Sequence, residues 1–305
     1  MYDKANPLFL LCESPLHAGS GSGLGIVDLP IQREKHTGFP KIEGSSLKGS
    51  LREFFETKYG HNGDDNEANT LALFGSDSDA EEGKSQAGAM GVSDARLLLF
   101  PVKSMKGVFA WVTCPRILYR FKEDYQLSGQ ELELEIPSPG SIAPGSNLLL
   151  AGQQVVLEEY AFKEVQESEA VGALGEWLAS RLYEGQDYWS EKLRQDIFVL
   201  EDEDFQDFAN LSTEVITRTK ISSETGTVEP GALFTEEYLP SDALLYSVIF
   251  TRGEFQNKDK DKDTIRTEEQ LRTFFANTLN ESPILQLGGN YTLGKGVLRT
   301  KYLNL

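Results

Sequence analysis

Apolar and polar residues follow two kinds of pattern along the chain, one typical of strands and one typical of helices. A compact apolar run at residues 8–13 is typical of a buried strand, and a loop with four glycines follows it. Two hydroxyls at Ser45 and Ser46 favour a helix start. The apolar positions after them have the spacing of a core-facing helix: Leu47, Leu51, Phe54 and Phe55. The chain therefore opens with a strand, a loop and a helix.

The middle of the chain changes character several times. Residues 62–85 are acidic and contain glycine, so they are predicted to form a loop with at most one turn near 71–74. Residues 92–102 and 108–121 are rich in β formers and are predicted to form a hairpin. The Ser-, Gly-, Pro- and Glu-rich residues 122–153 indicate an insertion.

The second half of the chain contains further patterns that predict strands and helices. A helix is predicted at 170–183, a short strand at 197–200 and a further strand at 244–251. Residues 267–279 again have helical spacing, and a last strand is predicted at 297–303. Residues 258–263 alternate in charge sign and are predicted to be a solvated loop.

One long hairpin is predicted between these elements. Residues 213–221 alternate in the β manner, turn through 222–226 and resume toward Leu239. Together the elements predict an α+β fold with a ferredoxin-like β-α-β-β-α-β core that is interrupted by insertions. Such a sheet is a common RNA-binding platform.

Composition places the chain among ordinary globular proteins. Its 305 residues are 39% hydrophobic and 25% charged, which excludes general disorder. No apolar run approaches the roughly 20 residues that a membrane span requires, and the start lacks the features of a signal sequence, so a cytoplasmic protein is expected. Cys12, Cys114 and three scattered histidines are too few for a disulfide framework or a zinc site.

The net charge of −19 argues against nucleic acid until its distribution is considered. Four acidic stretches account for the whole excess: residues 64–82, 122–135, 158–169 and 201–207. Residues 30–52 and 288–301 are instead basic. These two stretches are where phosphate binding is expected.

Two glycine-rich segments suggest nucleotide sites at first sight. Residues 289–295 spell G-x-x-x-x-G-K, but Gly296 replaces the Ser/Thr of a P-loop and no helix fits before the end of the sequence. Residues 21–26 lack the last glycine of a dinucleotide motif. The second segment is then either a tight turn or a backbone cradle for RNA, in which glycine permits close approach. The residues predicted to form this cradle are Gly288, Gly289, Gly294, Lys295, Gly296 and Arg299.

The start of the first helix is a second candidate phosphate-binding site, which we call the predicted phosphate seat. Lys48 and Arg52 are four residues apart and share a helix face, while the start of the helix favours anions. The residues predicted to contact RNA here are Ser45, Ser46, Lys48, Gly49 and Arg52. A solvated helix face with snorkelling basic side chains is the alternative.

Four residues are candidates for chemistry. His17 precedes the first glycine loop and Asp28 follows it, flanked by apolar residues, so its carboxylate needs a partner that is protein, metal or a ribose hydroxyl. Glu236 and Tyr238 alternate onto one strand face. By themselves, residues of these two types are more often ordinary strand-surface residues.

Six short segments carry a shared signal, at residues 16–19, 28–33, 43–49, 94–98, 112–115 and 288–296. Together they resemble the RAMP superfamily, and more narrowly the repeated backbone subunit of type III-B CRISPR (Cmr) effector complexes. The resemblance implies a single RAMP domain over residues 1–305, shaped as a hand with a modified RNA-recognition fold. Its palm is expected at about 1–60, 86–121 and 241–305, its fingers at about 61–85 and 122–210, and its β-hairpin thumb at about 211–240.

The resemblance also implies a function. Further copies of the chain and other type III-B subunits would assemble on a guide crRNA and cut complementary target RNA at regular intervals, and no membrane is involved. Asp28 matches the residue required for the cut, and His17, Glu236 and Tyr238 match other residues implicated around it. Arg218 and Lys220 would face RNA from the thumb. A divalent cation such as Mg²⁺ would bind weakly, through Asp28 and RNA phosphate.

Three alternatives remain open from the sequence. The chain could be a scaffold of the same fold that binds guide RNA without cutting. It could also be a stand-alone endoribonuclease that processes CRISPR repeats, or a structural protein without RNA.

Overall fold

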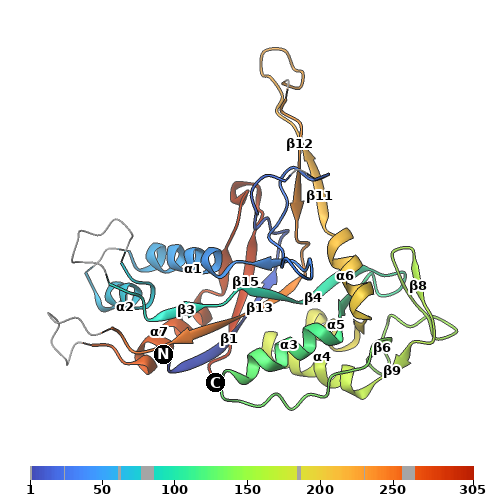
Figure 1. Ribbon diagram of the computed structural model, residues 1–305, viewed down its shortest axis with the longest axis horizontal. Coiled ribbons are helices and arrows are strands. Elements are labelled where there is room, and N and C mark those ends of the chain that lie inside the picture. Colours follow the sequence, from blue (N-terminus) through green and yellow to red (C-terminus); the bar gives the residue numbers. More distant parts are fainter. Residues whose placement is uncertain are drawn as a thin grey trace.

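The computed structural model describes residues 2–23, 25–60, 63–76, 86–183, 187–229, 231–255 and 265–305 (Figure 1). The helices are α1 (Gly44–Tyr59), α2 (Asp65–Phe74), α3 (Pro115–Gln126), α4 (Glu169–Leu182), α5 (Tyr188–Gln195), α6 (Asp202–Leu211), α7 (Glu268–Glu281) and the 3₁₀ helix η2 (Tyr291–Leu293). The strands are β1 (Lys4–Cys12), β2 (Lys41–Ile42), β3 (Met90–Val92), β4 (Ala95–Lys103), β5 (Phe109–Thr113), β6 (Ser141–Ile142), β7 (Val155–Leu157), β8 (Tyr160–Phe162), β9 (Gln166–Glu167), β10 (Ile197–Val199), β11 (Glu214–Arg218), β12 (Phe234–Tyr238), β13 (Leu244–Thr251), β14 (Ile284–Gln286) and β15 (Val297–Tyr302). In these residues no helix is both long and apolar enough to cross a membrane.

A large mixed sheet organises the molecule, with strand order β14-β15-β1-β13-β4-β5-β10-β6-β9. Its first five strands are antiparallel, and β1 pairs with β13 from Lys4↔Thr251 to Leu11↔Leu244. Along the chain α1 lies between β1 and β4, and α7 lies between β13 and β14. Parallel pairing appears where β5 meets β10 and where β6 meets β9. The predicted mixed α+β class is therefore confirmed.

Helices cover both faces of the antiparallel part. On one face α1 and α7 bury the stacked rings of Phe55 and Phe275, whose centroids are 5.4 Å apart. On the other face Phe121 of α3 packs 4.8 Å from Tyr246 and 5.8 Å from Phe9. Phe9 and Tyr246 are at most 2% exposed. The sheet face is thus closed by protein, so its aromatic residues are not an exposed platform for RNA.

A hairpin of β11 and β12 projects away from the sheet, at the top of Figure 1. Its register runs from Glu214↔Tyr238 to Arg218↔Phe234, and an Ile221↔Val228 bridge continues the pairing toward the tip. The hairpin predicted from residues 213–239 is confirmed. Its base, at Tyr238 and Glu214, is where it joins the body of the molecule.

Several predicted elements are confirmed with small shifts of their ends. They are β1, α1, the β4–β5 hairpin, α4, β10, β13, α7 and β15. The cap of α7 is a capping box, in which Thr267 accepts from the Gln270 backbone and the Gln270 side chain accepts from the Thr267 backbone. The loop predicted at residues 258–263 lies outside the described residues.

Two predictions about secondary structure are wrong. Residues 62–85 were expected to be a loop, but they contain α2, because Asp64 caps its start by accepting from Asn66 and Glu67 at 2.9 and 3.0 Å. Residues 108–121 were expected to be β throughout, but α3 begins at Pro115, whose fixed φ suits the first helical position. The sequence patterns also missed α5, α6 and β14. Residues 61–62 and 77–85 lie outside the described part.

Candidate functional site

Segments that are far apart in the sequence meet at the base of the β11–β12 hairpin. Leu16 and Leu239 exchange backbone hydrogen bonds of 2.8 and 2.9 Å. The Leu29 backbone donates to Thr235 and accepts from Glu237, both at 3.0 Å. Both ends of the first glycine loop are thus bonded to β12 and the residue that follows it, while β11 pairs with β12 itself. This pairing brings the segments of His17, Asp28 and Glu236 to one place.

The last glycine-rich segment completes this base. Gly289 N–H donates to the His17 carbonyl at 3.0 Å, and Gly296 N–H donates to the Pro15 carbonyl at 2.9 Å. Gly288 and Gly296 have φ values of +83° and +74°, and a Cβ on either would overlap a carbonyl oxygen, that of His17 or Leu287. Glycine is therefore required here for close packing of backbone on backbone.

Glu236 and Tyr238 lie side by side on one face of β12 and are at most 5% exposed. Tyr238 OH donates to Glu236 Oε2 at 2.7 Å and accepts from Arg218 Nη2 at 2.7 Å. Arg218 also pairs with Glu236 through its Nε. Asn290 Nδ2 donates to Tyr238 OH at 2.9 Å and to Glu236 Oε1 at 3.1 Å. We call these four residues the β12 cluster.

Ionisation in the β12 cluster follows from these contacts. Burial alone would raise the pKa of Glu236, but the hydrogen bonds from Tyr238, Asn290 and Arg218 hold it below its usual value. Burial raises the pKa of Tyr238, and the adjacent Glu236 carboxylate adds to that rise. At neutral pH the pair is therefore a carboxylate beside a protonated phenol.

His17 lies next to this cluster, with its ring centroid 5.5 Å from that of Tyr238. Its Nδ1 is 2.7 Å from the carbonyl oxygen of Glu237. Because a carbonyl only accepts, Nδ1 carries a hydrogen, and Nε2 is the ring nitrogen that remains for exchange of a proton. A Cβ at Gly19 would lie 2.8 Å from Nε2, so glycine at this position keeps the space beside that atom open.

Asp28 is exposed beside the cluster rather than inside it. Its Oδ2 accepts from Thr235 N at 2.8 Å and from Thr235 Oγ1 at 2.9 Å. These bonds lower the pKa of Asp28, so the carboxylate is ionised. Thr235 and Glu236 are neighbours on a strand and face opposite sides. Among the described residues, the hydrogen bonds of the Asp28 carboxylate are with Thr235 and none reaches His17, Glu236 or Tyr238.

A buried ion pair anchors the same region, and sequence reasoning missed it. Glu237 pairs with Arg33 and accepts from Ile31 N at 3.0 Å and Thr213 Oγ1 at 2.7 Å. The other guanidinium nitrogen of Arg33 donates to the Ala209 carbonyl at 3.0 Å. The pair therefore joins the loop after Asp28, the end of α6 and the hairpin base.

The start of α1 is arranged differently. Gly44 N–H donates to Asp94 Oδ1 at 2.9 Å, so a protein carboxylate already occupies part of the predicted phosphate seat. Ser46 Oγ accepts from Gln32 at 3.3 Å. Ser45 and Gly49 are exposed, and the space beside Gly49 is open.

The predicted RNA-binding cations mostly have protein partners. Lys48 Nζ donates to the Met90 carbonyl at 2.9 Å, and burial together with nearby Arg52 lowers its pKa. Arg52 pairs with Glu56 at 2.6 Å.

The remaining predicted cations lie on the hairpin and near the last strand. Arg299 pairs with Glu13 at 2.6 Å, and Lys220 on the hairpin pairs with Glu229 at 2.8 Å. Lys295 instead lies 5.0 Å above the Tyr238 ring. Gly294 has φ +73° and open space around it.

The described residues contain no group of three or more His, Cys, Asp or Glu that could hold a metal ion. Asp28 is nevertheless suited to one contact with a hard cation, because it is exposed, ionised and held by Thr235. Such an ion would need its other oxygen ligands from water or from a bound phosphate.

Comparisons with known proteins identify relatives of this chain in both sequence and fold. The RAMP superfamily model matches residues 9–299. The chain is 40% identical over 303 residues to the CRISPR system Cmr endoribonuclease Cmr4 of Pyrococcus furiosus, covering 97% of this chain and 95% of that protein. It is 27% identical to the CRISPR system CMR subunit Cmr4 of Saccharolobus solfataricus, covering 99% and 98%. The crystal structure of oligomeric Cmr4 from Pyrococcus furiosus superposes with a TM-score of 0.70 at 29% identity and covers 99% of both chains.

Proposed function

Because the chain belongs to the RAMP superfamily and, within it, to the Cmr4 family, we propose that it is a guide-RNA-binding backbone subunit of a type III-B CRISPR effector complex that cleaves complementary target RNA at regular intervals. The observation that carries this proposal is the convergence of His17, Asp28 and the β12 cluster at the hairpin base. The relatives named as an endoribonuclease and as an oligomer support the activity and the self-assembly.

The fold supplies a frame for this role. We infer that strands β15-β1-β13-β4 with α1 and α7 form the ferredoxin-like palm, since their order and connections match a β-α-β-β-α-β unit. The β11–β12 hairpin would be the thumb, and α2 together with the elements from β6 to α6 would belong to the fingers. A projecting hairpin whose base carries the polar cluster suits a wedge that splays target RNA beside the site.

The reaction is proposed as in-line attack of a splayed 2′-oxygen on the adjacent phosphorus. The 2′-oxygen loses its proton as it bonds to phosphorus, and the 5′-oxygen leaves and takes up a proton. His17 Nε2 is suited to exchange one of these protons, because Nδ1 is fixed by the Glu237 carbonyl. The β12 cluster would hold the backbone of the hairpin base in place, and Lys295 would attract phosphate. In-line positioning would supply much of the rate.

Asp28 has the role that its environment favours. Its lowered pKa makes it a weak base but a persistent anion, which favours holding a hydrated Mg²⁺ or similar cation against RNA phosphate. Such a cation, when bound, supplies charge neutralisation at the reacting phosphate.

The test uses the assembled complex with guide and target RNA. Asp28→Asn should lower the single-turnover cleavage rate by at least about a hundredfold, a size typical of a group that acts in the transition state, while guide loading and target affinity stay unchanged. Glu13→Gln is the matched control, because it neutralises an exposed carboxylate whose one ion pair among the described residues is with Arg299. Normal cleavage by the Asp28→Asn complex would remove the catalytic assignment and leave the non-cutting scaffold. Cleavage of repeat RNA by the isolated chain, without a target, would favour the stand-alone enzyme instead.

A further inference from the structure

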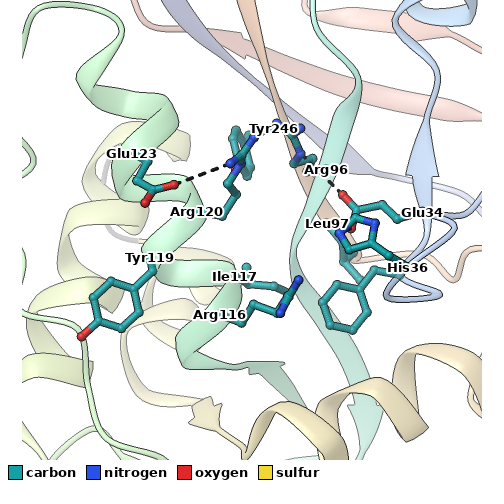
Figure 2. Close-up of a pocket in the computed structure, with 11 residues that line it drawn as sticks. Glu34, His36, Arg96, Leu97, Arg116, Ile117, Tyr119, Arg120, Glu123 and Tyr246 are labelled. Carbon is teal, nitrogen blue, oxygen red and sulfur yellow. Dashed lines mark ion pairs between the residues drawn. The ribbon is translucent and has the colours of Figure 1, made fainter.

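A cavity of about 360 Å³ lies between α3, β4 and the loop that carries His36 (Figure 2). We call it the α3 pocket and define it by Glu34, His36, Phe39, Arg96, Arg116 and Arg120. None of the candidate site residues lines it. It therefore requires an explanation of its own.

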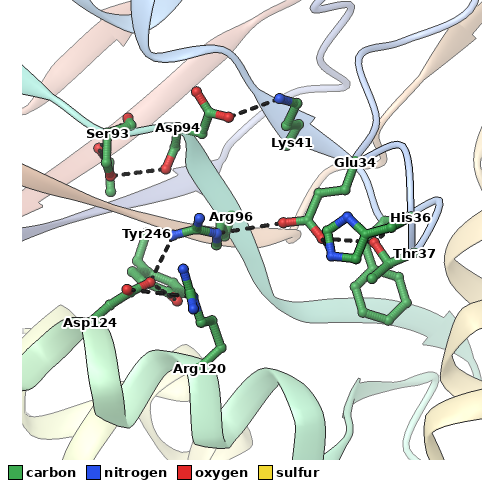
Figure 3. A network of polar contacts seen from close by, with 12 residues as sticks. Glu34, His36, Thr37, Lys41, Ser93, Asp94, Arg96, Arg120, Asp124 and Tyr246 are labelled. Atoms are coloured by element: carbon green, nitrogen blue, oxygen red, sulfur yellow. Dashed lines mark hydrogen bonds and ion pairs between the residues drawn. The ribbon is translucent and has the colours of Figure 1, made fainter.

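The acidic groups in and behind the pocket wall are already satisfied by protein (Figure 3). Asp124 accepts from Arg96 Nη1 at 2.8 Å and from Tyr246 OH at 2.9 Å. Glu34 accepts from Thr37 Oγ1 at 2.7 Å and lies 3.5 Å from Arg96. Burial alone would lower the pKa of Arg96, but Asp124, Tyr246 and Glu34 raise it, so its charge is fixed. These acids hold the wall together and leave little negative charge for a ligand.

Arg116 is the positive group left over. Its backbone N–H donates to Asp202 at 3.1 Å, but within the described residues its guanidinium has no hydrogen bond or ion pair. In Figure 2 the side chain points from α3 toward the loop that carries His36. Arg120, at the same edge, is half exposed and lies 3.6 Å from Glu123. The pocket thus presents one guanidinium that has no ion pair among the described residues, which favours an anion.

We propose that the α3 pocket binds one nucleotide of single-stranded RNA, with a phosphate on Arg116 and the base on the apolar floor. The floor consists of Phe39, Leu97 and Ile117, each at most 7% exposed. A cavity of this volume lies within the range of small-ligand sites, roughly 300–1,000 Å³. A nucleotide would contact both parts of the pocket, with its flat base on the apolar floor and its phosphate on the Arg116 guanidinium. An acidic side chain would contact only the guanidinium.

This inference rests on the proposed function, because the RNA would be guide or target. The pocket and the candidate site share one loop, which runs from Asp28 to Phe39. Arg33 on that loop is paired with Glu237 at the hairpin base, and the next residue, Glu34, forms part of the pocket wall. RNA held in the pocket would therefore contact the same loop that carries Asp28.

The experiment measures binding of a fluorescent single-stranded oligouridylate by the full-length chain at several salt concentrations. Arg116→Glu should weaken binding by about tenfold and flatten the slope of log affinity against log salt by about 0.7, the value for one phosphate contact on a single strand. Lys163→Glu is the control, since it changes the net charge equally at an exposed position and should alter affinity less than twofold. Arg116 is exposed, so neither variant removes a buried side chain.

Each outcome separates this inference from the proposed function. If Arg116→Glu binds RNA as the unaltered chain does, with the same salt slope, the pocket assignment is wrong and the proposed function stands. If Arg116→Glu keeps RNA binding but loses association with further copies in light scattering, the pocket takes an acidic protein segment and the inference is overturned. If the unaltered chain binds no RNA at all, both proposals fail.

Discussion

The hairpin base and the start of α1 carry similar polar residues, but they use them in opposite ways. At the hairpin base, side chains from four distant segments converge, and among the described residues neither Lys295 Nζ, which lies over the Tyr238 ring, nor His17 Nε2 has a hydrogen-bond partner. At the start of α1, the predicted cations are turned onto protein acceptors, as Lys48 is onto the Met90 carbonyl. The difference teaches that a basic residue in the sequence does not always present its charge to a ligand. Only basic side chains that are not already bonded to protein acceptors are available to bind one.

The largest expected effect is the loss of stability when the ion pair at the hairpin base is broken. Glu237→Gln removes one partner of a largely buried ion pair and leaves the Arg33 charge unpaired, so the free energy of unfolding should fall by about 3 kcal/mol, the lower end for buried pairs because the Arg33 side chain is 20% exposed. At the start of α1, Asp94→Asn should cost only about 1 kcal/mol, because the carboxylate is a third exposed and caps one helix. Urea denaturation of both variants measures the two values. Equal losses would contradict the contrast between the regions.

The second effect concerns the close packing of the last glycine segment. Gly296→Ala places a Cβ against the Leu287 carbonyl, whereas Gly294→Ala at nearly the same φ meets open space. Both variants strain a left-handed backbone by about 1–2 kcal/mol, and Gly296→Ala should cost about 1–3 kcal/mol more from overlap. Thermal unfolding compares the matched pair. If Gly294→Ala were as destabilising, overlap would not be the reason for glycine at 296.

These contacts define what the sequence could and could not predict. Periodicity located α1 and α7 because each buries one apolar face, and apolar runs located β1 and β13 because both faces of these strands are buried. The strand alternation also placed Glu236 and Tyr238 on one face, and they are hydrogen-bonded to each other. The partner Asn290 could not be assigned, because its contact depends on a left-handed φ of +64° and on packing between segments 54 residues apart.

The Arg33–Glu237 pair could not be predicted either. A basic residue in a basic stretch suggests phosphate, and only the fold shows that a carboxylate 204 residues away faces it. The missed helix α2 is different, since Asp64 followed by Glu67 is a capping signal that the acidic composition obscured.

A smaller effect is expected on RNA affinity, which compares a lysine at the hairpin base with one at the start of α1. Lys295→Gln should weaken binding of single-stranded RNA several-fold and flatten the salt slope by about 0.7, because its charge is available to phosphate. Lys48→Gln should change affinity less than twofold, since its ammonium donates to the Met90 carbonyl. Fluorescence titrations at several salt concentrations distinguish the two. A larger loss of affinity for Lys48→Gln would show that Lys48, rather than Lys295, is the cation available to phosphate.

The smallest expected effect is an absence of acid sensitivity. The pKa values of Asp28 and Glu236 are lowered in the folded chain, so both stay ionised as pH falls toward the ordinary carboxyl range near 4. Any stabilisation that they provide is present above their unfolded pKa values and is lost only as pH falls through the lower folded values. Single-turnover cleavage between about pH 5 and 8 should therefore show no step from these groups. An acid step that vanishes in Asp28→Asn or Glu236→Gln would contradict these directions.

The central claim is that target RNA is cut at the hairpin base. Target RNA carrying 4-thiouridine at the cleaved nucleotide, bound to the assembled complex with Asp28→Asn, should crosslink to peptides that contain His17 or residues 288–296. Crosslinks confined to the start of α1, around Ser45 and Lys48, would contradict the account.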